Sequence, residues 1–215
     1  MTQTRPDLAY SIAYLSRYLN SPTELLFKAV KRVFRYLLKS IDLSITYQGN
    51  NKPELIGYCD SDFAGDYDTR KSTYGYLFKF NNSPISWKTK RQSTIALSTT
   101  EAEFNSLEQA IREATWLKNL LNELLYPINY ILIKGDNLST INLAYNPEYH
   151  QRTKHTALRY YYVRQEIEKG TIKVEYIPTT EMPANGLTKP LPNTKFQQFI
   201  QLINLQHSKY IEYNN

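Results

Sequence analysis

The sequence predicts a mixed α/β domain preceded by a short helical segment, and three observations lead to this class. Strand-like apolar segments alternate with segments in which apolar residues recur every three to four positions. Three of the strand-like segments follow one another without a helix, which indicates an antiparallel meander. Later strands are separated by helices, which indicates parallel additions to the same sheet. The 215 residues suffice for one domain of about 150 residues plus an appendage.

Residues 1–50 are expected to form two helices. Pro6 suits the first turn of one helix. Ser21 is expected to cap the second, with Pro22 at its first position and Glu24 completing a capping box. One face of this helix is apolar, through Leu26, Val30, Val33 and Leu37. Another face is basic and is either a solvated surface or a phosphate-contacting stripe, formed by Lys28, Arg32, Arg35 and Lys39.

The turn around 49–53 separates this segment from the predicted α/β domain, residues 51–192. Five strands are expected, at Leu55–Asp60, Tyr74–Phe80, Pro84–Lys88, Tyr130–Gly135 and Thr171–Ile177. Asn81-Asn82-Ser83 reads as a hairpin turn. Helices are expected at Thr100–Leu125, Leu138–Tyr145 and Leu158–Lys169, and shorter ones near 182–188 and 194–204. Residues 193–215 form the expected C-terminal helix and tail.

Composition limits the class of protein. Hydrophobic residues make up 41% of the chain, enough for a substantial core. The net charge of +6 favours an anionic partner such as nucleic acid, although ordinary surface charge explains it equally well. The single cysteine, Cys59, excludes an internal disulfide and a cysteine-based zinc site. No apolar run approaches the ~20 residues of a membrane span. We therefore expect an intracellular protein without a membrane partner, in the cytoplasm or the nucleus.

A carboxylate lies on the core-facing stripe of the predicted long helix. This stripe consists of Glu103, Leu107, Ala110, Ala114, Leu117, Leu121 and Leu124. Glu101 lies off it, beside Glu108, and is expected to face solvent. A buried carboxylate is costly unless it is paired or bound to metal, which favours Glu103 as a ligand. The alternative is a first-turn acid that complements the helix dipole.

Two aspartates end predicted strands on either side of that helix in the sequence. Asp60 shares a strand face with Asp62, and Asp136 closes a later strand. Functional groups gather at the carboxyl ends of parallel strands, although turn aspartates that cap a loop are the alternative. Carboxylates without histidine or cysteine favour Mg²⁺ or Mn²⁺. Two such ions ~4 Å apart are suited to hydrolysis of a phosphodiester.

Several motifs resemble copia-type retrotransposon polyproteins. Thr4–Tyr10, Ala29–Arg32 and Arg35–Leu37 resemble the segment that links polymerase to nuclease there. Other motifs resemble the ribonuclease H domain of the same polyproteins: Gly57–Asp66, Arg70–Thr73, Ala96–Glu103, Asp136-Asn137, Arg152–His155 and Leu187–Leu191. Residues 1–50 then correspond to the connection or thumb region of the reverse transcriptase. The polymerase domain of the parent element becomes an expected partner.

The resemblance implies a ribonuclease H-like fold that cuts the RNA strand of RNA–DNA hybrids with two Mg²⁺ or Mn²⁺ ions. That family uses four acids, and Asp60, Glu103 and Asp136 fall on the first three. The fourth position holds Asn185, whose amide brings no charge and attracts a divalent ion less. The alternative function is therefore a catalytically impaired, nucleic-acid-binding remnant. An integrase core is disfavoured, because its glutamate comes last among the acids and Glu103 comes second.

A set of basic residues is expected to line a nucleic-acid groove. Phosphate contacts from such residues would position a duplex without reading its sequence. The set comprises Arg70, Lys71, Lys88, Lys90, Arg91, Arg152 and Lys154.

Overall fold

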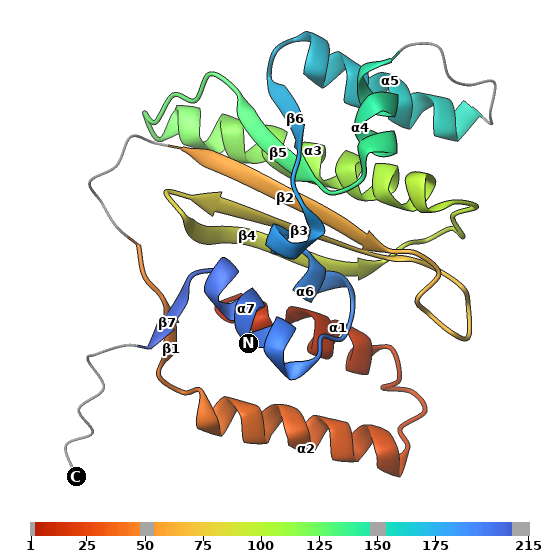
Figure 1. Ribbon diagram of the computed structural model, residues 1–215, viewed down its shortest axis with the longest axis vertical. Helices are drawn as coiled ribbons and strands as arrows, with labels where there is room; N and C mark the ends of the chain where they lie inside the picture. The colour runs from red at the N-terminus through yellow and green to blue at the C-terminus, as the bar shows by residue number, and fades with distance from the viewer. Residues whose placement is uncertain (1–2, 48–53, 147–153, 208–215) are drawn as a thin grey trace.

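A five-stranded mixed sheet forms the centre of the protein (Figure 1). The computed structural model describes residues 3–47, 54–146 and 154–207, with the backbone alone for 154–156. The strands are β2 (Leu55–Asp62), β3 (Thr73–Phe80), β4 (Ser83–Arg91), β5 (Ile131–Gly135) and β6 (Ile172–Tyr176). They lie in the order β4-β3-β2-β5-β6. β2, β3 and β4 are antiparallel neighbours, whereas β5 pairs in parallel with β2 and β6. The predicted mixed α/β class is confirmed.

The predicted hairpin turn joins β3 to β4. Asn81 and Asn82 both have positive φ, at 48° and 65°. Two successive left-handed residues match the twist of the flanking strands, and asparagine tolerates this conformation. The turn pairs Phe80 with Ser83 and so sets the register of the hairpin.

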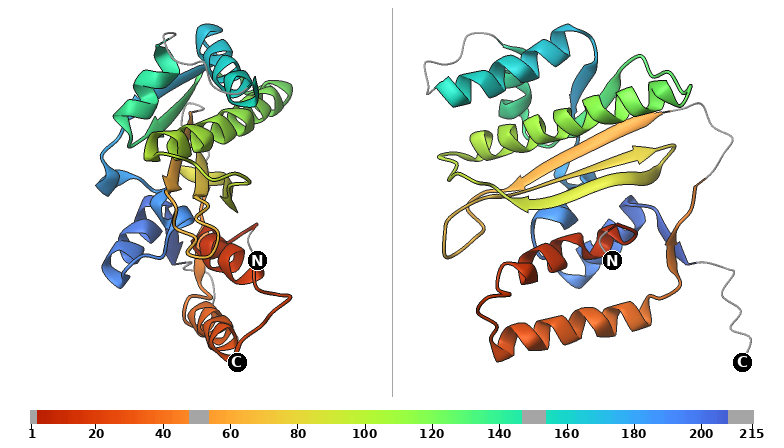
Figure 2. Two further views of the ribbon diagram at one scale, coloured as in Figure 1. Left: turned by 90° about the vertical axis from the view of Figure 1, so that its right-hand side faces the viewer. Right: turned by 180° about the vertical axis from the view of Figure 1, so that it is seen from behind.

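The long helix α3 (Thr99–Glu123) packs against β2, β3 and β5. Ser98 caps it, because its hydroxyl accepts from Glu101 N at 3.1 Å, while the Glu101 carboxylate accepts from Leu97 N at 2.9 Å. Glu101 thus has a capping role. Helices α4 (Leu138–Tyr145) and α5 (Lys154–Glu168) pack against α3 and against each other (Figure 2). The main core lies among these elements and includes Phe78, Leu107 and Ile133.

Two predictions about α3 were wrong. Glu108 was expected beside the exposed Glu101, but it is 2% exposed and ion-paired with Arg112. Burial extends beyond one stripe because strands contact one part of the helix and α4 and α5 contact another. Leu124 was expected in the buried stripe, but it is 57% exposed. The helix ends at Glu123, so the helical spacing no longer holds Leu124 against the core.

The N-terminal and C-terminal helices of the described chain pack together on a second core. Helices α1 (Ala9–Ser16), α6 (Asn185–Thr188) and α7 (Asn193–Leu202) contribute Ala9, Leu187 and Phe199, which gather with Leu77 of β3. Leu77 and Phe78 are neighbours on β3 and belong to different cores, because successive side chains of a strand point to opposite faces. In Figure 1 this second layer lies below the sheet. Short β1 (Leu43–Ile45) pairs antiparallel with β7 (Leu205–His207), and neither strand was predicted.

Helix α2 (Glu24–Lys39) runs along the edge of this layer (Figure 1). Its predicted start was two residues early, because Thr23, not Ser21, is the cap. The hydroxyl of Thr23 accepts from Leu26 N at 3.3 Å, and its backbone is extended while Glu24 begins the helix. The predicted apolar face is half-buried and the predicted basic face is exposed. No helix in the described segments has the length and apolar character that crossing a bilayer requires.

A buried ionic network joins the start of the described chain to the end of α2. The Arg5 guanidinium donates to both carboxylate oxygens of Asp7, at 2.7 and 3.0 Å, and to the Ser40 carbonyl at 2.9 Å. The Tyr36 hydroxyl donates to Asp7 at 2.7 Å. Because buried charges are tolerated when paired and hydrogen-bonded, this network seats α2 beside the 3₁₀ turn at Pro6–Leu8.

Candidate metal centre

Three carboxylates converge at one end of the sheet. Asp60 comes from β2, Glu103 from the start of α3, and Asp136 from the residue after β5. Each offers one oxygen, and the three oxygens lie within 4.8 Å of one another. β2 and β5 are parallel neighbours, so their carboxyl ends meet at one edge. The structure thus brings together the three acids that the sequence singled out.

Asp60 is the buried member of the group, and α6 holds it from one side. The Thr188 hydroxyl donates to its Oδ2, and Lys189 Nζ lies 3.7 Å from the same oxygen. Burial raises the pKa of Asp60, against the opposing effects of Lys189 and Thr188. The sequence reasoning did not assign Thr188 or Lys189 to the site. The signal was present, because both lie in the Leu187–Leu191 motif.

Glu103 is half-buried near the first turn of α3. Burial, together with the neighbouring charges of Asp60 and Asp136, raises its pKa to about 9. With its pKa raised above neutral, Glu103 keeps its proton at pH 7 unless a cation replaces it.

Asp136 is linked to a 3₁₀ turn, η2 (Thr179–Glu181), that precedes α6. The Thr179 hydroxyl donates to Asp136 Oδ2 at 2.8 Å. The adjacent Asn137 caps α4 by accepting from Thr140 N at 2.9 Å. Asp136 therefore sits between the end of a strand and a capped helix start, and both restrain its backbone.

Asn185 lies outside the three-carboxylate group but is connected to it through Thr179. Its amide nitrogen donates to the carbonyl oxygens of Thr179, at 2.9 Å, and Met182, at 3.2 Å. This pairing assigns the amide orientation, because an oxygen in that place would face two carbonyl oxygens. The Asn185 Oδ1 atom is buried and has no hydrogen-bond partner among the described residues.

Asp62 follows Asp60 by two residues but lies outside the group. It is half-buried, and burial raises its pKa despite the influence of Lys189. Its carboxylate packs over Gly65, where an added Cβ would come within 1.8 Å of Asp62 Oδ2. Asp62 thus packs against the loop that follows β2.

The predicted basic residues fall into different surroundings. Lys88 and Lys90 are exposed on one face of β4, and Arg70 is exposed on the loop before β3. Arg91 instead pairs with the buried Asp66 at 2.8 Å. The side chains of the remaining predicted positions are either half-buried, as for Lys71, or outside the described residues, as for Arg152 and Lys154.

The donor set fits a hard divalent cation. Three carboxylates with no histidine or cysteine are typical of Mg²⁺ or Mn²⁺ ligands. The orphaned Oδ1 of Asn185 is a further oxygen without a partner, and buried oxygens of this kind are rare in proteins.

The fold and the acidic group define a ribonuclease H-like domain, and the chain belongs to the copia-type Pol polyprotein family. It is 41% identical over 206 residues to the retrovirus-related Pol polyprotein from transposon TNT 1-94 of Nicotiana tabacum, covering 95% of this chain and 15% of that polyprotein. It is 39% identical over 201 residues to the Pol polyprotein from transposon RE2 of Arabidopsis thaliana, covering 93% of this chain and 14% of the relative. The chain therefore matches only a small part of each relative.

No family model matches the chain. Among solved structures, the N-terminal ribonuclease H domain of a Mycobacterium tuberculosis protein aligns with a TM-score of 0.48 at 12% identity. That alignment covers 69% of this chain and 97% of the other.

Proposed function

We propose that this chain is a ribonuclease H-type endonuclease domain that hydrolyses the RNA strand of RNA–DNA hybrids. The observation that supports this proposal is the convergence of Asp60, Glu103 and Asp136 within 4.8 Å. These three residues would hold two Mg²⁺ or Mn²⁺ ions. Such ions, when bound, lower the pKa of the attacking water and stabilise the leaving oxygen of a phosphodiester.

The surrounding residues prepare the carboxylates for this task. Thr188 and Lys189 orient Asp60, and Thr179 orients Asp136, each through the contacts described above. Residues that hydrogen-bond metal ligands fix the ligand geometry and affect metal affinity strongly. Asn185 provides an oxygen but no charge, so the site has three anions where four are usual in the family.

Because that charge is missing, the chain has a second candidate function. The chain would then be a catalytically impaired module that binds nucleic acid without cutting it. Asn185 is the observation that favours this alternative. It predicts salt-sensitive hybrid binding, which reflects contacts to phosphates, with no turnover.

We further propose that the domain works inside the cell, beside the polymerase domain of the parent polyprotein. The family of its relatives and the single buried Cys59 support this proposal. Co-expression of the two domains, followed by size-exclusion chromatography, tests the association.

A cleavage assay separates the two functions. Purified protein is incubated with an RNA–DNA hybrid carrying a 5′ label on the RNA, in Mg²⁺ or in Mn²⁺. Asp60→Asn is the matched control, because it keeps the side-chain shape and removes a charge. Cleavage by the natural chain and its loss in Asp60→Asn support the nuclease. If Asp60→Asn still cleaves the hybrid, the activity comes from a contaminating nuclease and does not support the proposal.

Asn185→Asp extends this assay. If only the variant cleaves, the natural chain is an impaired enzyme. If neither chain cleaves the hybrid in either metal but both bind it, the nuclease proposal is wrong and the binding function is supported.

A further inference from the structure

A groove of about 840 Å³ runs between the N-terminal helices and the C-terminal segment. Helices α1 and α2 form one side, and α6, α7 and the residues between them form the other. We propose that this groove binds a polynucleotide strand that continues from the metal centre. The inference rests on the proposed nuclease function, and it adds a substrate-binding surface outside the sheet and its acidic group.

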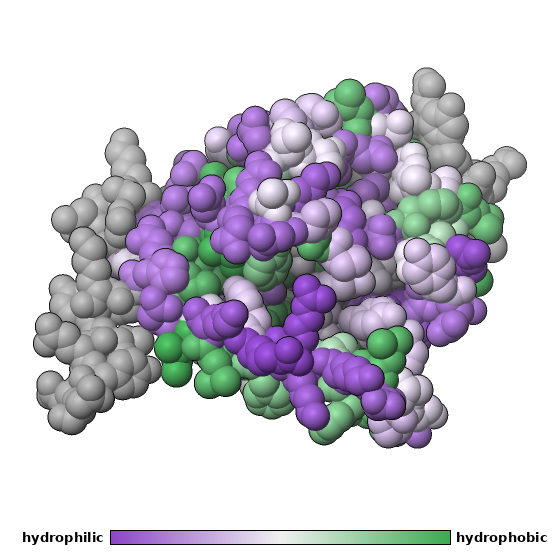
Figure 3. Space-filling model, turned by 60° about the horizontal axis from the view of Figure 1, so that its bottom comes forward, coloured by the Kyte–Doolittle hydropathy of each residue, from purple (hydrophilic) through white to green (hydrophobic). Residues whose placement is uncertain are grey.

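Cations lie on both walls of the groove. Lys28 and Arg32 line it from α2, and Lys189 lines it from the opposite wall. Lys28 pairs with Glu24 at 2.8 Å, but both side chains are more than 60% exposed, at 67% and 82%. Such a surface pair is weak, and a polyanion competes with it. In Figure 3, where the α2 side of Figure 1 comes forward, a band of hydrophilic side chains crosses this face between hydrophobic ones.

The acidic residue of the lining does not oppose an anionic ligand. Asp7 has a side-chain exposure of 0% and is neutralised by Arg5 at 2.7 Å. Asp7 also accepts a hydrogen bond from the Tyr36 hydroxyl, so its carboxylate points into the buried ionic network. The accessible charge of the groove is therefore positive, which is complementary to a phosphodiester backbone.

Tyrosines line the groove beside these cations. Tyr10 and Tyr14 are one turn apart on α1, and their rings stack with centroids 6.1 Å apart and planes 27° apart. Tyr36 also lines the groove, from α2, but its ring is contacted by Arg5 and by the edge of Phe196. Bases stack on aromatic rings without sequence preference, while cations track the phosphates. An acidic peptide would use the cations but has no need of the ring surfaces, so a polynucleotide fits better.

Lys189 connects the groove to the candidate metal centre. It lines the groove, and its Nζ is 3.7 Å from Asp60 Oδ2. A strand with a phosphate at the three carboxylates therefore meets Lys189 first as it leaves toward α1 and α2. This continuity favours a strand of the substrate over an unrelated ligand.

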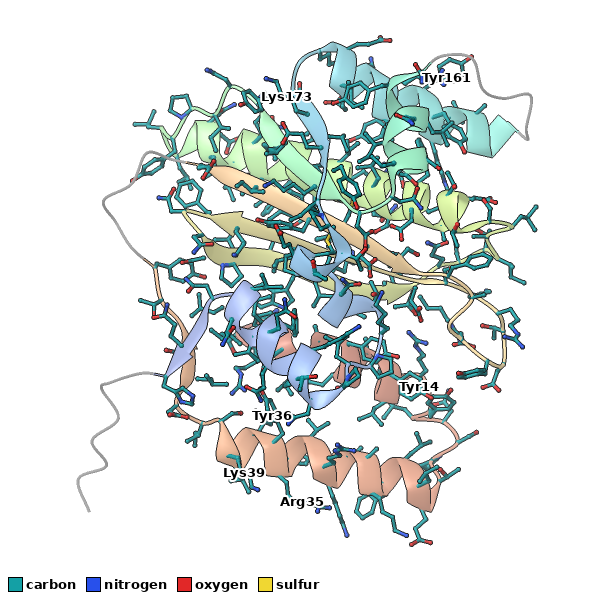
Figure 4. All side chains as sticks on the ribbon, viewed as in Figure 1. Tyr14, Arg35, Tyr36, Lys39, Tyr161 and Lys173 are labelled. Carbon is teal, nitrogen blue, oxygen red and sulfur yellow. The ribbon has the colours of Figure 1, made fainter. Side chains whose placement is uncertain are left out.

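The charge test uses two double variants of the same helix. Lys28→Glu/Arg32→Glu reverses the groove cations, whereas Arg35→Glu/Lys39→Glu makes the same charge change on residues that do not line the groove. In Figure 4 Arg35 points away from the rest of the protein. Binding of a fluorescent RNA–DNA hybrid is measured by anisotropy in EDTA, which prevents metal-dependent cleavage, over a range of NaCl concentrations.

We expect the groove variant to bind about tenfold or more weakly, and to lower the slope of log K against log salt by about 2. The control variant should remain within about threefold of the natural chain. Equal losses of hybrid binding in both variants would show that the charge effect is not specific to the groove, and would overturn the proposal. Unchanged binding in the groove variant would overturn it as well.

Photo-crosslinking gives an independent readout. A benzophenone side chain replaces Tyr14 or, as control, Tyr161, which is 67% exposed on α5 at the opposite end of the protein (Figure 4). Crosslinks to the labelled hybrid from position 14 alone support the proposal. If position 14 crosslinks a poly-glutamate peptide and not the hybrid, the groove binds an acidic protein ligand and the proposal is wrong.

The two proposals fail separately. A chain that cleaves hybrids while Lys28→Glu/Arg32→Glu binds normally keeps the nuclease and loses the groove. A chain without cleavage whose groove variant loses hybrid binding keeps the groove and loses the nuclease.

Discussion

The side-chain amide of Asn185 donates to the carbonyl oxygen of Thr179 at 2.9 Å. Thr179 in turn donates from its hydroxyl to Asp136 at 2.8 Å. The position where the family's fourth acid is expected is therefore tied to the acidic group through one threonine. This arrangement uses the amide as a donor, which a carboxylate cannot be.

Thr179→Val should weaken divalent-cation binding about 10- to 100-fold, because it removes the hydrogen bond that orients Asp136. Thr179→Ser keeps the hydroxyl and should bind Mn²⁺ like the natural chain. Isothermal titration with Mn²⁺ measures both. Equal affinities for Thr179→Val and the natural chain would remove Thr179 from the site.

Asn185→Asp should have opposite effects with and without metal. The new carboxylate faces the carbonyls of Thr179 and Met182, so the metal-free variant should lose about 1–3 kcal/mol of unfolding free energy. The added charge should strengthen Mg²⁺ binding, so Mg²⁺ should raise its melting temperature more than that of the natural chain.

Asn185→Ala is the matched control for this variant, because it removes the amide without adding charge. It should be destabilised and gain nothing from Mg²⁺. An Asn185→Asp protein that is more stable than the natural chain in EDTA would contradict the donor role of the amide.

The metal-free protein should lose stability as pH rises from about 4.5 to about 9. Glu103 titrates near its usual value of 4.5 when unfolded and at about 9 when folded. Between these values the folded state binds more protons, so the free energy of unfolding falls with pH, by at most about 1.4 kcal/mol per pH unit for one proton. Urea unfolding in EDTA at several pH values measures this slope.

Glu103→Gln should flatten that slope, because the amide does not titrate. A saturating divalent cation should flatten it in the natural chain, since the ion replaces the proton. A slope that is the same in the natural chain and in Glu103→Gln would assign the pH dependence to other groups.

Asp66→Asn should destabilise the fold by about 3–5 kcal/mol, because it leaves two cations without their buried partner. Asp66 pairs with Arg17 of the N-terminal segment at 3.1 Å and with Arg91 of β4 at 2.8 Å. Despite the opposing effect of burial, Arg91 and the hydrogen bonds from Thr69 hold the pKa of its carboxyl well below the usual range. Asp68→Asn, on the same loop and exposed, is the control and should change stability by less than about 0.5 kcal/mol. Thermal and urea unfolding compare them.

Periodicity in the sequence was enough to predict the sheet and to choose Glu103 over Glu101. Helical spacing put Glu103 on the core side, and strand alternation with chain order put Asp60 and Asp136 at strand ends. Each of these inferences uses only neighbours in the sequence. The same reasoning misplaced Glu108, because a helical wheel contains no information about how many elements will cover a helix.

Tertiary structure alone decided the contacts between distant segments. β1 and β7 are three residues each and pair across the whole chain, too short for a pattern to reveal them. The hydrogen bond from Thr188 to Asp60, the Thr179 link between Asn185 and Asp136, and the groove beside Lys189 all join residues far apart in sequence. Local residue patterns thus determined which acids are available. Packing of the C-terminal segment against the sheet determined which side chains hold those acids.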